Sequence, residues 1–294
     1  MKGFSVIIPT LNRTMFLINT LKDLVCQDFK FPFEIIVVDQ SKKEDSTVFD
    51  FAKTNSIIKY HYIKHFKGLP EARNYGASIS LYDYLLYLDD DIICNPDLLT
   101  QHFTFLDKKK ISLVAGGITE KFKKNIDCKI GKFIKRSANP LRGFHKEAQK
   151  EVDHAGGGNF SIKKSVLFKV GGFDENLSKG AALYEETDFC LRVKKAGHTI
   201  FYNHKAHMFH LAAETGGCRV SEINKYVYAL SRNRTIIIQR YLSWYYRFTA
   251  NMYLLKVVLG YVKAYKDISL YKSYQKGKFE GKKVALQPIL NTSK

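Results

Sequence analysis

The segment that most constrains the fold of this chain is Tyr84–Asp91, with the sequence YLLYLDDD. Its apolar half is typical of a strand whose two faces are both buried in a parallel sheet. Asp89, Asp90 and Asp91 follow at the carboxyl end of that strand, where open α/β sheets bind their ligands. Because unpaired buried carboxylates are costly, we expect a cation there, and a hard divalent ion such as Mn²⁺ or Mg²⁺ suits oxygen ligands. The alternative is an acidic turn in contact with solvent.

Three further apolar runs have the same character and alternate with helical patterns. We expect these strands at Phe4–Pro9, Glu34–Asp39 and Ile57–Tyr62. The helices are expected at Met15–Cys26, Asp45–Asn55, Gly68–Ala77 and Pro96–Lys108. Strands that alternate with helices along the chain predict βαβ units. The fold class is therefore α/β, with a doubly wound and mainly parallel sheet.

Regularity is lost between residues 120 and 150 and returns afterwards. The irregular segment is rich in Lys and Arg, and we interpret it as a long excursion from the core, either a flexible loop or a loop that faces an acceptor. A helix over Tyr184–Gly197 carries three acidic residues in its first turn, Glu185, Glu186 and Asp188, where the helix dipole favours carboxylates. A further strand, Thr199–Tyr202, leads into three histidines, His204, His207 and His210.

The last segment, residues 221–294, differs from the rest in composition. It holds 14 Lys or Arg against three acidic residues, which accounts for +11 of the chain's net charge of +19, and it contains the only tryptophan, Trp244. Periodic apolar positions predict two or three amphipathic helices. Basic and aromatic residues on such helices favour an anionic membrane surface as a partner. A helical cap with a solvated lysine face is the alternative.

The charge of +19 implies anionic partners, such as nucleic acid, acidic lipid or phosphorylated substrates. No nucleic-acid-binding motif is present, and the excess charge lies mainly in the last segment, which argues against nucleic acid. A nucleotide-dependent oxidoreductase is excluded because no G-x-G-x-x-G follows the first strand. The five cysteines form no C-x-x-C pair, and we find neither a signal-peptide pattern nor an apolar run of membrane-spanning length. These features indicate a cytoplasmic protein with reduced thiols.

Six short motifs occur in order along the chain and together resemble the family 2 glycosyltransferases, which have a GT-A fold. They are VIIPTLNR (6–13), VDQS (38–41), the segment 68–74, LDDD (88–91), GGFDE (171–175) and EETDFCLR (185–192). The resemblance implies a GT-A domain over residues 1–220. Within it, residues 1–118 would form the nucleotide-sugar-binding half and residues 151–220 the acceptor and catalytic half. Residues 221–294 would form a helical C-terminal appendage.

The resemblance also implies roles for single residues. Pro9, Thr10 and Arg13 would line the nucleotide pocket, and Asp39 would hydrogen-bond the base. Arg73 would lie near the diphosphate, with a surface ion pair as the alternative, and Asp89 and Asp90 would help to hold the nucleotide sugar. Asp91 would bind the metal as the second carboxylate of the family's D-x-D motif. His210 would be a further metal ligand, with His204 and His207 as alternatives.

The general base is expected in the pair Glu185-Glu186. The family usually has Glu-Asp at this place, and the second carboxylate normally takes the proton from the acceptor. Glu186 inherits that role, with a longer side chain than the usual Asp, and Glu185 remains the alternative. The Q-x-x-R-W motif of processive members is absent, which favours the transfer of one sugar per acceptor.

The resemblance thus implies a metal-dependent, inverting enzyme that moves one sugar from a nucleoside-diphosphate sugar to an acceptor hydroxyl. The cofactor would be Mn²⁺ or Mg²⁺, and the acceptor a saccharide or a lipid-linked molecule in surface polysaccharide or glycan biosynthesis. The protein would be cytoplasmic, with the inner face of the cell membrane as a candidate docking surface. The alternatives are a catalytically inactive nucleotide-sugar-binding protein and a basic nucleic-acid-binding protein.

Overall fold

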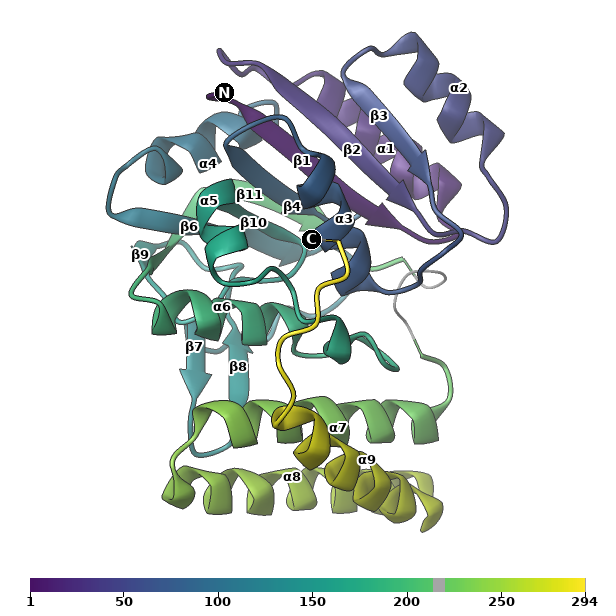
Figure 1. The fold of residues 1–294 in the computed structure, drawn as a ribbon, viewed down its shortest axis with the longest axis vertical. Helices are drawn as coiled ribbons and strands as arrows, with labels where there is room; N and C mark the ends of the chain where they lie inside the picture. The colour runs from purple at the N-terminus through teal and green to yellow at the C-terminus, as the bar shows by residue number, and fades with distance from the viewer. Residues whose placement is uncertain (214–219, 294) are drawn as a thin grey trace.

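A mixed β-sheet forms the centre of the molecule (Figure 1). The computed structural model describes residues 1–213 and 220–293. The strands of the central sheet lie in the order β3-β2-β1-β4-β10-β6-β11-β5, with β9 paired to β11. Their bounds are β1 (Phe4–Thr10), β2 (Phe33–Asp39), β3 (Ile58–Tyr62), β4 (Tyr84–Leu88), β5 (Ile92–Cys94), β6 (Ile111–Glu120), β9 (Gln149–Glu151), β10 (Asn159–Lys163) and β11 (Thr199–His210).

The strand directions bring several chain segments to one edge of the sheet. Strands β1 to β4 are parallel, β6 is parallel to β11, and β10 runs antiparallel between β4 and β6. The predicted α/β class is therefore confirmed. The carboxyl ends of β1, β2 and β4 meet at the same edge, which places Thr10, Asp39 and Asp89 there together.

Both faces of the sheet are buried, because helices cover each of them. Successive side chains of β1 point to opposite faces, so that Ile7 joins one core cluster while Val6 and Ile8 join the other. The Ile7 side is covered by α3 (Leu69–Ile79), α5 (Lys164–Lys169) and α6 (Glu185–Lys195). The opposite side is covered by α1 (Thr14–Val25), α2 (Ser46–Thr54) and α4 (Leu98–Leu106).

The interpretation of residues 120–150 as an irregular excursion is wrong in part. Strands β7 (Ile130–Ile134) and β8 (Asn139–Arg142) form an antiparallel hairpin, and β9 joins the central sheet. The hairpin was hidden in the sequence because Gly131, with φ of 51°, interrupts the register of β7 and because β8 contains Pro140. Strand β11 also continues eight residues beyond the predicted end at Tyr202, as far as His210.

The C-terminal region consists of α7 (Ile223–Tyr241), α8 (Trp244–Tyr265) and α9 (Ser269–Ala285), in agreement with the predicted helices. They share a hydrophobic cluster of their own, which also takes in Phe133 of the β7–β8 hairpin. None of the described helices combines the length and the apolar character needed to cross a bilayer. Figure 1 shows these helices below the sheet, with the chain returning from α9 toward α3.

The returning C-terminal segment is bonded to the turn that begins the 3₁₀ helix η1 (Glu175–Leu177). The backbone N–H of Glu175 donates to Leu290 O at 2.9 Å, and the hydroxyl of Thr292 donates to the Glu175 carboxylate at 2.8 Å. Asn74 of α3 donates to the same carboxylate at 2.9 Å. The chain end is thereby fixed to η1 and, through the shared carboxylate of Glu175, to α3 of the sheet domain.

The cysteines behave as the sequence indicates within the described part of the chain. Cys26, Cys94, Cys128 and Cys190 are all free thiols. Cys218 lies outside the described residues.

Helix α3 lies so close to β1 that one position has no room for a side chain. A Cβ on Gly76 would lie 2.5 Å from Cγ2 of the buried Ile7. We expect Gly76→Ala to destabilise the protein by about 1–3 kcal/mol, the usual cost of overpacking a core. Gly260 in α8 is the control, because nothing lies within 4 Å of its Cβ position. Gly260→Ala should stabilise the protein by up to about 1 kcal/mol. Denaturant unfolding of both variants measures these changes, and equal effects would show that close packing at Gly76 is irrelevant.

Candidate active site

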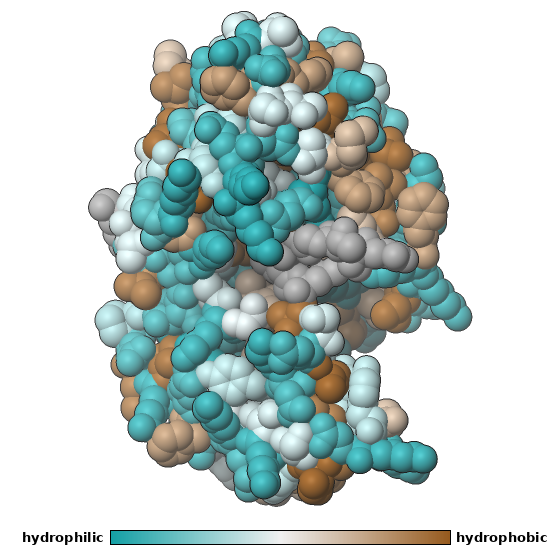
Figure 2. All heavy atoms as spheres, turned by 90° about the vertical axis from the view of Figure 1, so that its right-hand side faces the viewer, coloured by the Kyte–Doolittle hydropathy of each residue, from teal (hydrophilic) through white to brown (hydrophobic). Residues whose placement is uncertain are grey.

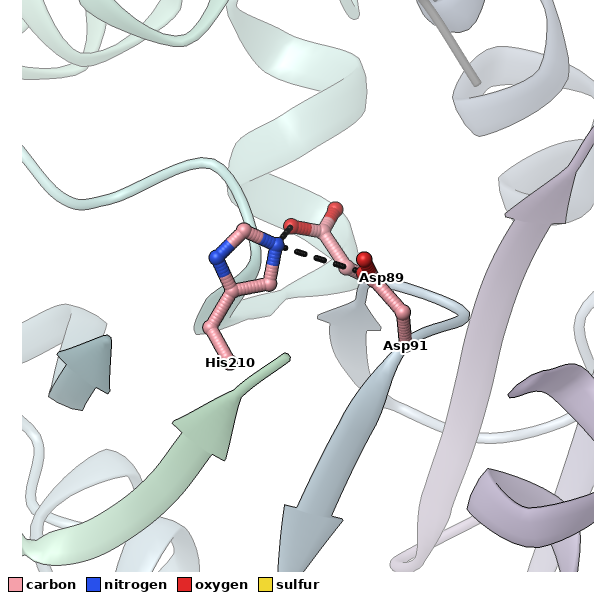
Figure 3. Close-up of side chains that lie close together, drawn as sticks. All are labelled: Asp89, Asp91 and His210. Carbon is pink, nitrogen blue, oxygen red and sulfur yellow. Dashed lines mark ion pairs between the residues drawn. The ribbon is translucent and has the colours of Figure 1, made fainter. Parts of the chain in front are cut away.

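The acidic turn after β4 lies against the end of β11. His210 pairs with Ile92 of β5 on one side and with Glu120 of β6 on the other. This register brings the imidazole of His210 over Asp89 and Asp91, as Figure 3 shows. His210 Nε2 lies 3.2 Å from Asp91 Oδ1 and 3.8 Å from Asp89 Oδ2. The predicted pair Asp91 and His210 is thus brought together, and Asp89 joins it.

The three side chains fit a divalent cation. One ligand atom from each lies within 4.8 Å of the others. Asp91 Oδ1 is buried and faces His210 Nε2, whereas Asp91 Oδ2 accepts the N–H of Ala213 at 2.7 Å. A buried carboxylate needs a positive partner, and either a protonated imidazole or a bound cation can supply it. Two carboxylates and one imidazole are suitable ligands for Mn²⁺ or a similar ion.

Glu120 orients the histidine of this cluster. Both carboxylate oxygens of Glu120 lie 3.1 Å from His210 Nδ1, which leaves Nε2 directed at the aspartates. Burial opposes the imidazolium, but the carboxylates of Asp91 and Glu120 outweigh it and raise the pKa of His210 to about 10. Without a metal, the protonated imidazole supplies the positive charge, and metal binding would release that proton. Sequence reasoning missed Glu120, because only the pairing of β6 with β11 brings it beside His210.

Asp90 turns away from this cluster toward β1. Its two oxygens accept the hydroxyl of Thr10 at 2.7 Å and Arg13 Nη1 at 2.8 Å. Arg13 Nη1 also lies 3.4 Å from Asp91 Oδ2, so a single guanidinium faces two of the three carboxylates. Burial raises the pKa of Asp90 to about 6, although Arg13 and the hydroxyl act in the opposite direction. Asp90 therefore ties the end of β1 to the acidic turn.

The neighbouring strand end holds Asp39, which is buried. Tyr60 donates its hydroxyl to Asp39 Oδ2 at 2.7 Å, and the N–H of Ser41 donates to Oδ1 at 2.8 Å. Pro9 lies beside it, because β1 and β2 pair Pro9 with Val38 and Thr10 with Asp39. The residues expected around a nucleotide thus line one continuous edge of the sheet.

A glycine turn separates the acidic cluster from helix α6. A Cβ on Gly158 would collide with Asp89, and one on Gly157 would lie 3.2 Å from Arg73 Nη2 and 3.8 Å from Cδ of Glu186. A side chain here would fill the space between the two groups. The turn forms part of the wall of a cavity of about 310 Å³ that also includes Asp89, His210 and Arg142.

Arg73 and Glu185 form a buried ion pair behind the glycine turn. Arg73 Nη1 donates to Glu185 Oε1, and Nη2 donates to the carbonyl of Gly157 at 2.7 Å. Arg73 is only 1% exposed, so the alternative of a surface ion pair is wrong for this residue. Burial raises the pKa of Glu185, although the charge of Arg73 opposes the shift.

Glu186 has a different environment from its neighbour. Its Oε1 accepts a hydrogen bond at 2.7 Å from Nη2 of Arg142, whose side chain is 64% exposed and lines the cavity. Burial would raise the pKa of Glu186, but Arg142 and then Arg73 outweigh it and lower the pKa. Tyr184 precedes the helix with φ of 68°, a left-handed conformation that is uncommon for non-glycine residues. Glu186 is thus a charged carboxylate beside the cavity, and Arg142 is a second residue that sequence reasoning missed.

Comparison with known proteins agrees with this geometry. The family model described as Glycosyl transferase family 2 matches residues 5–171, which is more than half of the chain. The chain belongs to glycosyl transferase family 2. This family 2 glycosyltransferase is 25% identical over 200 residues to the glucosyl-dolichyl phosphate glucuronosyltransferase of Haloferax volcanii. The match covers 65% of this chain and 63% of that enzyme, which is less than two thirds of the relative's length.

Two solved structures have the same fold as this glycosyltransferase. The S. aureus protein TarS (residues 1–349), in complex with UDP-GlcNAc, superimposes with a TM-score of 0.69 at 17% identity, covering 98% of this chain and 82% of that one. A mannosyltransferase from Pyrobaculum calidifontis, in complex with GDP-Man and Mn²⁺, gives a TM-score of 0.58 at 15% identity, covering 98% and 76%. The GT-A architecture inferred from the sequence is therefore confirmed.

The metal cluster generates a direct test. We expect Asp91→Asn and His210→Ala to weaken Mn²⁺ binding, because each removes a ligand. Glu120→Gln should weaken it by roughly 10–100-fold, the usual effect of losing a residue that orients a ligand. Calorimetric titration of Mn²⁺ in the presence of UDP or GDP measures all three. Asp50→Asn on the exposed face of α2 is the control, and wild-type affinity in Asp91→Asn would show that Asp91 binds no metal.

Proposed function

We propose that this glycosyltransferase moves one sugar from a nucleoside-diphosphate sugar to an acceptor hydroxyl, with inversion at the anomeric carbon. The observation that carries the proposal is the position of the Asp89, Asp91 and His210 cluster across the glycine turn from the charged Glu186. A divalent cation bound by that cluster would stabilise the charge that develops on the departing diphosphate. Mn²⁺ is favoured, since a protein with the same fold was solved with GDP-Man and Mn²⁺.

The edge formed by β1, β2 and β4 would hold the donor. Pro9, Thr10, Arg13 and Asp39 line this edge, and their proposed role is to contact the nucleotide. Asp89 is partly exposed to the cavity, so it can receive a hydroxyl of the donor. Asp90 would act mainly through Thr10 and Arg13, because its two oxygens are already bonded to them.

Arg73 would help to shape the sugar pocket. Its two terminal nitrogens are taken by Glu185 and by the carbonyl of Gly157, so it holds the glycine turn beside helix α6. The role expected from the resemblance, near the diphosphate, stays a prediction. A direct contact would require the guanidinium to exchange one of these partners for a phosphate oxygen.

Glu186 would be the general base. It is adjacent to the cavity, and its lowered pKa keeps it ionised at neutral pH. A base must be unprotonated before it can take the proton of the acceptor hydroxyl. The hydroxyl oxygen then attacks the anomeric carbon from the face opposite the diphosphate. The bond between the anomeric carbon and the diphosphate oxygen breaks as the new glycosidic bond forms. Glu185 would support this step by fixing Arg73.

The acceptor would be a saccharide or a lipid-linked molecule, in the biosynthesis of a surface polysaccharide or another glycan. The similar Haloferax volcanii enzyme is named for transfer to glucosyl-dolichyl phosphate, which supports a lipid-linked acceptor. An inactive nucleotide-sugar-binding protein is less well supported, because the proposed base and the proposed metal ligands are all present. We also propose that the protein is cytoplasmic and that it acts at the inner face of the membrane.

The outer face of α8 is the proposed membrane contact. The helix packs inward through Ala250, Leu254 and Val258, yet seven large apolar or aromatic residues on it remain exposed: Trp244, Tyr245, Phe248, Met252, Tyr253, Leu259 and Tyr265. At 100° per residue most of them share one face with Lys256 and Lys263. Figure 2 shows apolar side chains among hydrophilic ones over the lower end of the molecule, where this helical region lies. Such a mixture suits an anionic lipid surface.

The base assignment predicts different results for two neighbouring substitutions. Glu186→Gln keeps the shape but cannot accept a proton, so we expect turnover to fall by roughly 10²–10⁴-fold with donor binding retained. Glu185→Gln should act mainly on substrate binding. Turnover and nucleotide-sugar affinity of both variants measure the split. A dead Glu185→Gln beside an active Glu186→Gln would move the assignment by one residue.

The pH dependence provides an independent check of the same assignment. The pKa of Glu186 is lowered, so the base should stay ionised down to below the ordinary glutamate value of about 4.3. We expect kcat/KM to be insensitive to this group at neutral pH and to fall only at acid pH. The pKa of Glu185 is raised, so the same loss of activity at a pH well above the ordinary glutamate pKa would indicate that Glu185 is the base.

The membrane proposal can be tested on the intact protein. Trp244 and Phe248 are 81% and 66% exposed, and replacing both by Ser should weaken binding to anionic liposomes by at least about tenfold, since burying each side chain contributes about 1.5–3 kcal/mol. Met15→Ser with Leu81→Ser is the control, because these exposed residues lie on the sheet domain. Liposome cosedimentation measures both, and binding that ignores lipid charge and salt would contradict the proposal.

A further inference from the structure

We propose that the basic hairpin β7–β8 and strand β9 form a groove for the anionic part of a saccharide acceptor chain, that is, a glycan with repeated carboxylates or phosphates. The inference deepens the proposed function and rests on it, since it names the chemical class of the acceptor. Residues 121–150, which include the hairpin, hold ten Lys or Arg against two acidic residues.

The groove consists of two hollows beside the catalytic cavity. The first, of about 430 Å³, is lined by residues of β7 and β9 and of the segments before them, with Lys129, Lys132, Lys146 and Lys150 as its cations. The second, of about 520 Å³, continues along the hairpin and is lined by Lys132, Lys135, Arg136 and Lys194. Lys132 and Asp153 line both hollows, which shows that they adjoin.

The same chain segments connect the first hollow to the catalytic cavity. His145 lines the cavity, and the next residue, Lys146, lines the first hollow. In the same way, Ile126 lines the cavity and Cys128 lines the first hollow. Arg142 at the end of β8 pairs across the hairpin with Ile130, which directly follows Lys129. Because Arg142 lines the cavity and bonds to Glu186, the basic groove leads toward the proposed base. An acceptor chain that lies in the groove would therefore end near the group that is proposed to deprotonate its hydroxyl.

A bulge in β7 places Lys132 in the same hollow as Lys129, which directly precedes the strand. Residues three apart in a regular strand point to opposite faces. The register of β7 shifts between Ile130 and Lys132, where Gly131 has φ of 51° and a Cβ would lie 2.8 Å from Cβ of Val152. The extra residue brings Lys129 and Lys132 to the same side, and both line the first hollow. Five residues of strand span about 16 Å, which is longer than one sugar ring.

The charge of the groove is only partly neutralised by the protein. Asp153 pairs with Lys132 and Lys194, and Asp127 pairs with Lys146. Among the described residues, four cations of the groove form no ion pair: Lys129, Lys135, Arg136 and Lys150. Glu151 is the opposing charge that remains. A row of cations spaced along a strand suits a glycan that carries a series of single negative charges better than it suits a neutral glycan.

A glycan suits this groove better than nucleic acid or lipid. The groove leads to the cavity lined by Arg142, which is bonded to the proposed base Glu186, and such a base must meet a hydroxyl of the bound chain. An anionic bilayer is flat and would contact the exposed face of α8 instead. A nucleic acid would also be attracted by the charge, so the experiment includes it as a competing class.

The test is a binding experiment on the full chain with defined probes. Fluorescein-labelled oligogalacturonate supplies carboxylates, short polyphosphate supplies phosphates, and a neutral maltooligosaccharide of equal length supplies no charge. We expect one of the two anionic probes to bind in fluorescence polarisation and the neutral probe to bind far more weakly. The anion that binds identifies carboxylate or phosphate.

A matched pair of variants separates the groove from the overall charge. Lys129→Glu with Lys150→Glu should weaken binding of the anionic probe by about tenfold, from the loss of two charge contacts. Lys109→Glu with Lys110→Glu changes the net charge equally on an exposed turn away from the groove and should leave affinity within about twofold. Equal losses in the two variants, or no binding of either anionic probe, would overturn the proposal. So would a single-stranded DNA oligonucleotide of equal charge that binds more tightly and depends on Lys129 and Lys150.

The same proteins show whether the proposed function itself holds. The melting temperature is measured with Mn²⁺ and UDP or GDP, since a ligand of the native state raises it. The groove variant should keep the nucleotide shift of the wild type while it loses the anionic probe. If no nucleotide shifts the wild-type protein, the proposed function fails and the acceptor role of the groove fails with it. A nucleotide shift without specific probe binding refutes the groove alone.

Discussion

The buried negative charge at the end of β4 is the constraint on which the rest of the structure depends. Asp90 and Asp91 are adjacent in the chain and almost fully buried, so they repel each other unless cations and donors surround them. Arg13 approaches from the start of α1, the hydroxyl of Thr10 from β1, and His210 from β11. Removing one partner from such a group costs about 3–5 kcal/mol. The ends of β1, β4 and β11 must therefore meet at this point, next to the edge of β1, β2 and β4 that is proposed to hold the donor.

The sequence predicted those parts of the site that follow directly from strand ends and local helix chemistry. Asp91 and His210 meet as expected, because a carboxylate at the end of a buried strand can be recognised from its neighbours. Glu120 and Arg142 could not be found in this way, since they lie 90 residues from His210 and 44 from Glu186. Only the pairing of β6 with β11 and of β7 with β8 brings them into place. The hairpin itself escaped prediction because a bulge removed the alternation that indicates a strand.

The difference between Glu185 and Glu186 arises from their partners and not from their residue type. Glu185 faces Arg73, whose guanidinium lies over the neighbouring rings of Phe160 and Phe173, at distances of 5.8 and 5.3 Å from their centres. Glu186 faces Arg142, whose side chain is largely exposed at the cavity. Burial dominates the first pair, and the opposite charge dominates the second, so the two pKa values shift in opposite directions. Two identical carboxylates thereby become suited to a structural and a chemical role, a distinction that their spacing alone could not reveal.

Helix α7 is bonded to α6 as well as packed against α8 and α9. Asp188 is completely buried two residues after the proposed base, and it accepts hydrogen bonds from Arg192 of its own helix at 2.8 Å and from Tyr241 of α7 at 2.6 Å. Arg240 of α7 adds a further bond to Asp188 at 3.3 Å and one to Asp174 at 2.6 Å. Deleting residues 221–294 would therefore leave two buried carboxylates, Asp174 and Asp188, without these partners, and α6, which carries the proposed base, would lose its support. The boundary at residue 220 stays a prediction that rests on the change in composition. Hydrogen bonds from Arg240 and Tyr241 of α7 to Asp188 of α6 cross this boundary. The proposed membrane binding by α8 must consequently be tested with substitutions on the outer face of α8, because these leave the contacts with α6 undisturbed.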